Sequence, residues 1–245
     1  MGWNELLWIA QALLLLSGTV LIFRLFGRSG LMAYVVLNTV LCNIEVLKIV
    51  ELFGITSTLG NAIYGTTFLA TDILSEFYGK KHSQKAVWLG FISLIMMTAV
   101  MQFAILMKPS PVDTASPHLE YIFGMMPRIA AASLTAYLVA QMHDVWAFEF
   151  WKKVTKGKHL WLRNNLSTMV SQAIDTVVFC TIAFVGLYDA RTFMEILFTT
   201  YIFKWIVALL DTPFIYLARS AAKSKTVQDD IRRATMNEEG KVLAN

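Results

Sequence analysis

Ionisable and amide side chains recur at helical spacing inside stretches of sequence that are otherwise strongly apolar. One series places Ser133, Tyr137, Gln141 and Asp144 at intervals of four, four and three residues. On a helix, these intervals bring all the side chains to one face. Three further series follow the same rule: Asn165, Thr168, Gln172 and Asp175; Thr200, Lys204 and Asp211; and Asp72 with Glu76. Carboxylates, amides and an ammonium group in such places can bind a polar ligand or carry a proton.

Charged groups inside hydrocarbon cost several kcal/mol each and need a partner or water. For any single residue, an ion pair that only holds helices together is an equally good interpretation. For the whole set, a polar cavity between the helices is favoured, because apolar packing would hold a bundle at lower cost. Asp175 and Lys204 fall near the expected midplane, whereas Glu51, Glu76 and Asp144 fall near helix ends, where an interfacial role is favoured.

Long apolar blocks must position these residues. The chain has 245 residues, of which 56% are hydrophobic, and its mean hydropathy is +0.56. Blocks of about 20 residues are long enough to cross a bilayer as helices. We therefore expect an all-α, polytopic membrane bundle with about seven transmembrane helices. The predicted spans are 3–26, 31–53, 59–78, 84–107, 121–151, 162–188 and 192–218, the fifth beginning in earnest at Pro127.

Loop charges predict the orientation of the bundle. Sixteen of the 21 Lys and Arg residues fall in alternate loops and the C-terminal tail, whereas the opposite loops hold only Lys108 and Arg191. By the positive-inside rule, the N-terminus lies outside and the C-terminus in the cytoplasm. We divide the chain into a transmembrane domain, 1–218, and a cytoplasmic tail, 219–245, that forms a short helix or a frayed end. The basic balance thus reflects topology, and no nucleic-acid partner is expected.

Several function classes lack their motifs. The sequence has no G-x-x-x-x-G-K-[ST] phosphate loop, no H-E-x-x-H and no G-x-S-x-G. Its four histidines have no ligand spacing, and Cys42 and Cys180 lie inside apolar blocks. We therefore expect no enzyme activity, no cofactor and no metal. Ala132, Ala136 and Ala140 have small-xxx-small spacing, which favours packing within the chain over a homodimer contact.

Four segments resemble the YhhQ-type queuosine precursor transporters, a family also called VUT. They are TTFLATDILSEFYGKKHSQKAV at 66–87, RIAAASLTAYLVAQMHDVWAF at 128–148, SQAIDTVVFCTIAF at 171–184 and YIFKWIVALLDTPFIYL at 201–217. The resemblance covers nearly everything from about residue 31 to residue 217. It implies a six-helix core similar to the substrate-binding subunits of energy-coupling-factor vitamin transporters, with an added first helix. It also implies import of a 7-deazaguanine, such as preQ0, preQ1 or queuine, across the bacterial inner membrane.

The resemblance also assigns residues. By matching position, the polar signature of the family falls on Asn43, Asp72, Arg128, Ser133, Tyr137, Gln141, Asp144, Asp175 and Lys204. The predicted substrate-binding residues are Asn43, Asp72, Arg128, Tyr137, Gln141, Gln172, Asp175 and Lys204.

A carboxylate can accept two hydrogen bonds at once from the ring N1–H and the exocyclic amine of a deazaguanine. Asp72 and Asp175 are the alternatives for this role, with Lys204 or Arg128 compensating the charge, and Phe68, Tyr137 and Tyr201 are candidates for stacking on the base. Facilitated diffusion, proton coupling and an energising partner all stay open as driving forces. The alternative function is a binding subunit of a larger uptake complex that transports nothing alone.

Overall fold

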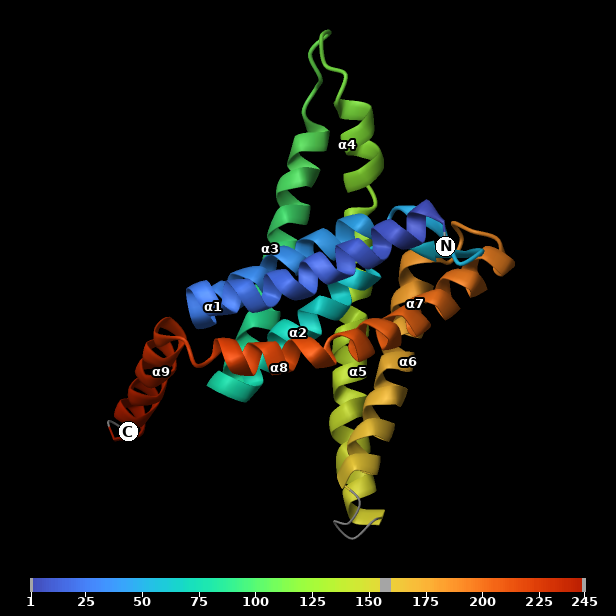
Figure 1. The fold of residues 1–245 in the computed structure, drawn as a ribbon. Coiled ribbons are helices and arrows are strands. Elements are labelled where there is room, and N and C mark those ends of the chain that lie inside the picture. Colours follow the sequence, from blue (N-terminus) through green and yellow to red (C-terminus); the bar gives the residue numbers. More distant parts are fainter. Residues whose placement is uncertain (1, 155–159, 244–245) are drawn as a thin grey trace. The chain divides into compact units, whose positions relative to one another are not determined.

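The computed structural model describes residues 2–154 and 160–243, and among these it leaves out the side chains at 144–145, 148–149, 151–154, 160–168 and 237–243. The predictions for Asp144, Asn165 and Thr168 therefore lie outside the described side chains. The elements are α1 Trp3–Glu45, β1 Ile49–Leu52, β2 Ile55–Thr58, α2 Asn61–Tyr78, α3 Lys80–Leu106, α4 Ser116–Phe123, α5 Met126–Val154, α6 Leu160–Phe184, α7 Ala190–Leu210, α8 Thr212–Ala221 and α9 Lys225–Leu243 (Figure 1).

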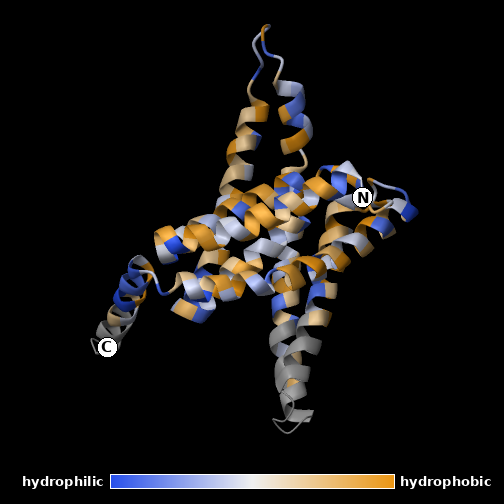
Figure 2. Cartoon of the chain, viewed as in Figure 1, coloured by the Kyte–Doolittle hydropathy of each residue, from blue (hydrophilic) through white to orange (hydrophobic). Residues whose placement is uncertain are grey.

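The expected fold class is confirmed: the chain is an all-α, multi-pass membrane protein. Within the described residues, four helical stretches are long and apolar enough to cross a membrane: Trp3–Glu45, Lys80–Leu106, Ser116–His143 and Ala190–Leu210, with a shorter apolar helix at Met169–Phe184. Apolar residues dominate α1 and α3, whereas α9 is mostly hydrophilic (Figure 2). The chain forms two compact units, Met1–Val100 with Ile202–Asn245 (unit 1) and Met101–Tyr201 (unit 2), which are described in turn.

In unit 1, α1 is a hairpin of two helices, and it corresponds to the first two predicted spans. Gly27 breaks the helix with φ 56° and ψ −137°, a conformation that glycine adopts at low cost. The hydroxyl of Tyr34 in the second arm donates to the carbonyl oxygen of Leu15 in the first arm, at 2.9 Å. Near the open end, Gln11 Nε2 donates to a carboxylate oxygen of Glu45 at 2.9 Å. The two arms therefore run antiparallel along their length (Figure 1).

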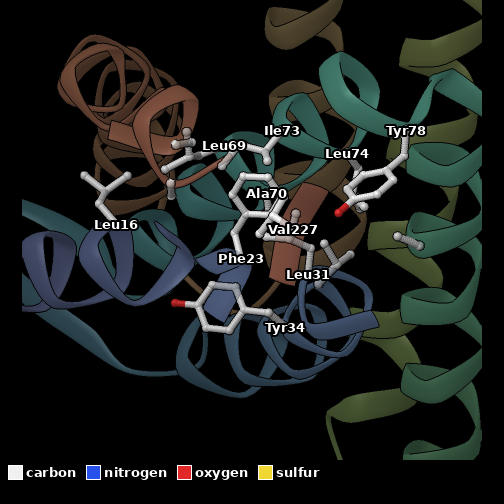
Figure 3. Close-up of a cluster of buried hydrophobic side chains, with 14 of the residues drawn as sticks. Leu16, Phe23, Leu31, Tyr34, Leu69, Ala70, Ile73, Leu74, Tyr78 and Val227 are labelled. Atoms are coloured by element: carbon white, nitrogen blue, oxygen red, sulfur yellow. The ribbon is translucent and has the colours of Figure 1, made fainter. Parts of the chain in front are cut away.

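The main core of unit 1 joins α1, α2, α8 and α9. Phe23 and Leu31, on either side of the break in α1, lie among Leu69 and Ile73 of α2 and Val227 of α9, all of them fully buried (Figure 3). Burial of such side chains gains about 1.5–3 kcal/mol each in water, and between membrane helices close packing takes over that role. This core fixes α2 against the α1 hairpin.

The second span is shorter than predicted. Helix α1 ends at Glu45, and residues expected to continue it to 53 instead form an antiparallel hairpin in which Ile49 pairs with Thr58 and Leu52 with Ile55. Two residues with positive φ, Phe53 at 55° and Gly54 at 76°, make the turn. Such a two-residue turn matches the twist of the flanking strands. The β-branched residues on both sides of the turn suit strands better than a helix.

The last predicted span also differs from the structure. It breaks at Asp211, so that α7 ends at Leu210 and α8 begins at Thr212. Pro213 lies in the first turn of α8, where its missing N–H costs nothing but prevents continuation of the preceding helix. In the C-terminal tail, the helical alternative is observed as α9, with Val227 and Ala234 buried in the core of unit 1.

In unit 2, α5 and α6 form an antiparallel pair, and α4 precedes α5. Helix α5 begins at Met126, beside the Pro127 predicted to start it. Ala132, Ala136 and Ala140 are all buried, which favours packing within one chain, and the homodimer stays a prediction. Asp189 caps the start of α7: its carboxylate accepts hydrogen bonds from the Thr192 hydroxyl at 2.7 Å and from backbone N–H groups. These bonds hold the pKa of the exposed Asp189 carboxyl below its ordinary value.

One carboxylate ties α9 to both the α1 break and the end of α2. Asp230 Oδ2 accepts from the backbone N–H of Arg28 at 2.8 Å and from the hydroxyl of Tyr78 at 2.9 Å. A side chain at Gly27 would overlap this same carboxylate, so the glycine permits the contact as well as the turn.

Asp230→Ala should therefore lower the midpoint of thermal unfolding in detergent. Loss of an acceptor shared by two partly buried donors costs about 1–3 kcal/mol. Gln228→Ala, at an exposed position of the same helix, is the matched control and should leave the midpoint unchanged. Equal midpoints for wild type and Asp230→Ala would show that this contact does not hold α9 in place.

Candidate functional site

One face of α2 carries two aromatic rings and a carboxylate at intervals of four residues. Tyr64, Phe68 and Asp72 are one turn apart, so their side chains follow one another along the helix. The rings of Tyr64 and Phe68 meet edge to face, with centroids 5.0 Å apart and an interplanar angle of 81°. Asp72 is exposed, and within the described part of the chain it has neither a hydrogen-bond nor an ion-pair partner. The face thus presents an aromatic surface that ends in an available carboxylate.

Lys204 of α7 lies over the start of this face. Its Nζ is 4.7 Å from the centroid of the Tyr64 ring, and the residue is 7% exposed. An ammonium over an aromatic face is stabilised by about 2 kcal/mol where water is excluded. The close approach depends on Gly65, because a Cβ at that position would overlap the side chain of Val207. The sequence thus brings α7 close enough to α2 for the lysine and the tyrosine to meet.

Asp211 lies at the opposite end of the same face, at the break between α7 and α8. It is half-buried, and its carboxylate is close enough to Asp72 for the two negative charges to interact. Both residues belong to unit 1. Two carboxylates that repel each other are stabilised together by a proton or by a ligand that offers several N–H donors.

Two asparagines of α1 lie in the interior of unit 1, and one of them contacts α2. Asn38 Nδ2 donates to Thr66 Oγ1 at 3.3 Å, while its Oδ1 is buried without a hydrogen-bond partner among the described residues. Asn43, a predicted site residue, is buried and donates from Nδ2 to the carbonyl oxygen of Thr39 at 2.7 Å. The structure therefore places Asn43 in the interior of unit 1, with one amide hydrogen used within its own helix.

In unit 2, Arg128 contacts the end of a helix. Its Nε donates to the carbonyl oxygen of Ile182 and its Nη2 to that of Val185, both at 2.6 Å. These carbonyls belong to the last turn of α6 and the residue after it, where no helical N–H can satisfy them. A cation there also complements the helix dipole. This geometry gives Arg128 a structural role, whatever its relation to a ligand.

A second contact between α5 and α6 fixes the register of the pair. His143 Nδ1 lies 3.0 Å from Ser171 Oγ, about four turns along α5 and about three turns along α6 from the Arg128 contact with Ile182. The antiparallel register then places Tyr137 at the level of Asp175, and Gln141 at the level of Gln172. Four of the predicted site residues thus fall at two neighbouring levels of one helix pair.

These four residues differ in exposure and in partners. Asp175 is buried and Tyr137 half-buried, and both take part in interactions within the chain. Gln141 is exposed. Gln172 Oε1 is buried without a hydrogen-bond partner in the described residues, which is costly for an amide. In unit 2 the available acceptor is therefore Gln172, not Asp175.

The eight predicted site residues fall in both units: unit 1 holds Asn43, Asp72 and Lys204, and unit 2 holds Arg128, Tyr137, Gln141, Gln172 and Asp175. Sequence reasoning passed over Tyr64, although its position four residues before Phe68 and eight before Asp72 was a usable signal. The cavity expected between all polar faces stays a prediction.

Comparisons with known proteins agree with a transporter. Residues 58–218 match the family model described as "Putative vitamin uptake transporter". The "Probable queuosine precursor transporter" of Bacillus subtilis (strain 168) is 42% identical over 217 residues, covering 88% of this chain and 95% of the relative. The "Queuosine precursor transporter" of Escherichia coli (strain K12) is 27% identical over 164 residues, covering 66% of this chain and 72% of the relative. No solved structure matches the chain.

The matched residues run from the second strand to the break after α7 and through α8 as far as 218, so they contain Tyr64, Asp72, Asp175 and Lys204. The match covers well over half of the chain, and the Bacillus relative is similar over nearly its whole length. The chain therefore belongs to the vitamin uptake transporter family.

Proposed function

We propose that this protein imports a queuosine precursor, a 7-deazaguanine such as preQ0 or preQ1, or queuine, across the bacterial inner membrane. The curated relatives named as queuosine precursor transporters support this substrate class. The structural observation that supports this substrate class is the α2 face, where the available carboxylate of Asp72 follows the rings of Tyr64 and Phe68. A flat base with two neighbouring N–H donors on one edge suits such a face.

The base stacks on an aromatic ring of this face and turns its donor edge to the carboxylate. Asp72 accepts from the ring N1–H and from the exocyclic amine, a bidentate contact strengthened by its charge. Stacking of a base on an aromatic side chain contributes about 1–3 kcal/mol. Lys204, whose ammonium lies over the Tyr64 ring at the other end of the face, supplies the compensating positive charge. Of the two carboxylates proposed from the sequence, Asp72 is preferred because Asp175 is buried and already engaged.

In unit 2, the proposed ligand groups are Gln141, Gln172 and Tyr137. Gln172 Oε1 is a buried acceptor without a partner among the described residues, so a donor from a bound ligand would remove a cost of about 1–3 kcal/mol. Asp175 then acts by positioning, through its interaction within the chain.

Uptake by the purified chain alone tests the proposal. Liposomes that contain only this protein should accumulate or equilibrate radiolabelled preQ1 faster than protein-free liposomes, and unlabelled preQ0 should compete whereas adenine should not. If the liposomes bind preQ1 without taking it up, the chain is a binding subunit that needs a partner. If they neither bind nor transport any deazaguanine, the proposed substrate class is wrong.

The role of Asp72 has a sharper test. Wild-type protein should bind 7-deazaguanine more tightly than 7-deazahypoxanthine, which lacks the exocyclic amine, by about tenfold or more, because a hydrogen bond to a charged group is worth about 1.5–3 kcal/mol. Asp72→Asn should lose most of this difference, since an amide cannot accept from both donors. Competition for preQ1 uptake measures both constants.

Glu76→Gln is the matched control, one turn further along the same helix. Glu76 is exposed and pairs with Arg219 at 3.0 Å, a surface contact worth little. The Glu76→Gln variant should therefore keep the wild-type preference for 7-deazaguanine over 7-deazahypoxanthine. If Asp72→Asn also keeps it while Asp175→Asn loses it, Asp175 is the carboxylate that recognises the base.

The proposal includes the orientation predicted from loop charge, with the N-terminus outside and the C-terminus in the cytoplasm. Contacts within unit 1 support a common side for three basic segments, because Arg28 Nη1 lies 2.9 Å from His82 Nε2 and Arg219 pairs with Glu76. A fluorescent protein fused after Asn245 should fluoresce, and alkaline phosphatase fused there should be inactive. The reverse pattern is expected for fusions after Val112. An active phosphatase at Asn245 would contradict this orientation.

A further inference from the structure

A cavity of about 450 Å³ lies between the α1 break and α9, in segments outside the residues that match the family. Leu25 and Phe26 line it from α1, and Lys225, Asp229 and Arg233 line it from α9. All of these residues belong to unit 1. The cavity therefore combines an apolar wall with both signs of charge, and none of its lining residues belongs to the proposed substrate site.

The charges in this cavity are available to a ligand. Lys225, Asp229 and Arg233 follow one another at intervals of four residues on α9, a spacing that permits ion pairs along a helix. Nevertheless, none of the three makes an ion pair or a side-chain hydrogen bond within the described residues, and all are exposed. Asp230, which also lines the cavity, differs because it binds the backbone N–H of Arg28 and the hydroxyl of Tyr78.

An exposed apolar stripe leads from this cavity along the first arm of α1. Leu14, Leu21 and Leu25 lie seven and four residues apart, on one helix face, and are 72%, 56% and 53% exposed. Phe26 beside them is 64% exposed. On a membrane-spanning helix such a stripe faces acyl chains, and the charged cavity lies where the helix ends, at the level of lipid headgroups.

We infer that this cavity binds the headgroup of a zwitterionic aminophospholipid, with its phosphate on Lys225 and Arg233 and its ammonium on Asp229. An anionic headgroup would leave Asp229 facing a negative charge. A phosphoethanolamine headgroup carries an anion and a three-donor cation, and therefore satisfies both signs of charge. Its acyl chains continue along Leu25, Leu21 and Leu14.

Native mass spectrometry of the full chain in mild detergent tests this inference. The palmitoyl-oleoyl forms of phosphatidylethanolamine, phosphatidylglycerol and phosphatidylcholine are added in equal amounts. The protein should retain phosphatidylethanolamine about fivefold more than either of the other two lipids. Lys225→Gln with Arg233→Gln should reduce its retention about tenfold, as expected for loss of charge-assisted bonds to the phosphate. Asp229→Asn should abolish the preference for ethanolamine over choline and leave retention of phosphatidylglycerol unchanged or raised.

The matched control removes the same charge outside the cavity. Lys223→Gln with Arg232→Gln changes two exposed residues that do not line it and should leave lipid retention at the wild-type level. Equal retention of the three lipids by wild type, or an unchanged preference in the Lys225 and Arg233 double variant, would overturn the inference. A preference for phosphatidylglycerol would show an anionic site instead. Displacement of the lipid by micromolar soluble O-phosphoethanolamine would show that the acyl chains play no part.

Discussion

Lys204 imposes the strictest physical requirement on the architecture of unit 1. An ammonium group within an apolar helix costs several kcal/mol unless another group stabilises it. Here the face of Tyr64 lies 4.7 Å from the ammonium, and this contact requires α7 to pack closely against the first turns of α2. Gly65 permits that approach, because any larger side chain would overlap Val207. The lysine contact thus lies where α7 meets α2, and Asp211, at the break after α7, is close enough to Asp72 for the two charges to interact.

The α1 hairpin holds α2 in place from the other side. Gly27 reverses the chain in a conformation that other residues resist, and the backbone N–H that follows it is bound by Asp230 of α9. The same carboxylate binds the hydroxyl of Tyr78 at the end of α2. The helix that bears Asp72 is thus fixed at its start by the packing of Gly65 and at its end by the C-terminal helix. A rigid helix of this kind can present a ligand group with little entropic cost on binding.

The apolar helices could be predicted from the sequence because apolar blocks of membrane length are a strong signal. The turn of α1 at Gly27 lies within the predicted interval between the first two spans. The β-hairpin was missed because its first strand, Ile49–Leu52, continues the apolar run of the helix before it, and only the Phe53–Gly54 turn distinguishes it. The break in the last predicted span, 192–218, was also missed, although Pro213 marks it in the sequence. Contacts between residues that are distant in the sequence could not be predicted. Nothing in the local sequence indicates that Arg128 binds carbonyl oxygens 54 and 57 residues away, or that Tyr64 contacts Lys204.

Three side chains of the helices offer an acceptor that has no donor within the described part of the chain. The carboxylate of Asp72 has no donor among the described residues, and the amide oxygens of Asn38 and Gln172 are buried without one. A buried acceptor left without any partner costs about 1–3 kcal/mol, so native structures satisfy most such atoms with a protein group, a water molecule or a ligand. The buried indole N–H of Trp8 is the opposite case, a donor without an acceptor in the described residues, but the three side chains named above all lack a donor. A ligand that reduces this cost must bring N–H groups, which a deazaguanine offers at its ring nitrogens and its amine, whereas a simple anion offers none.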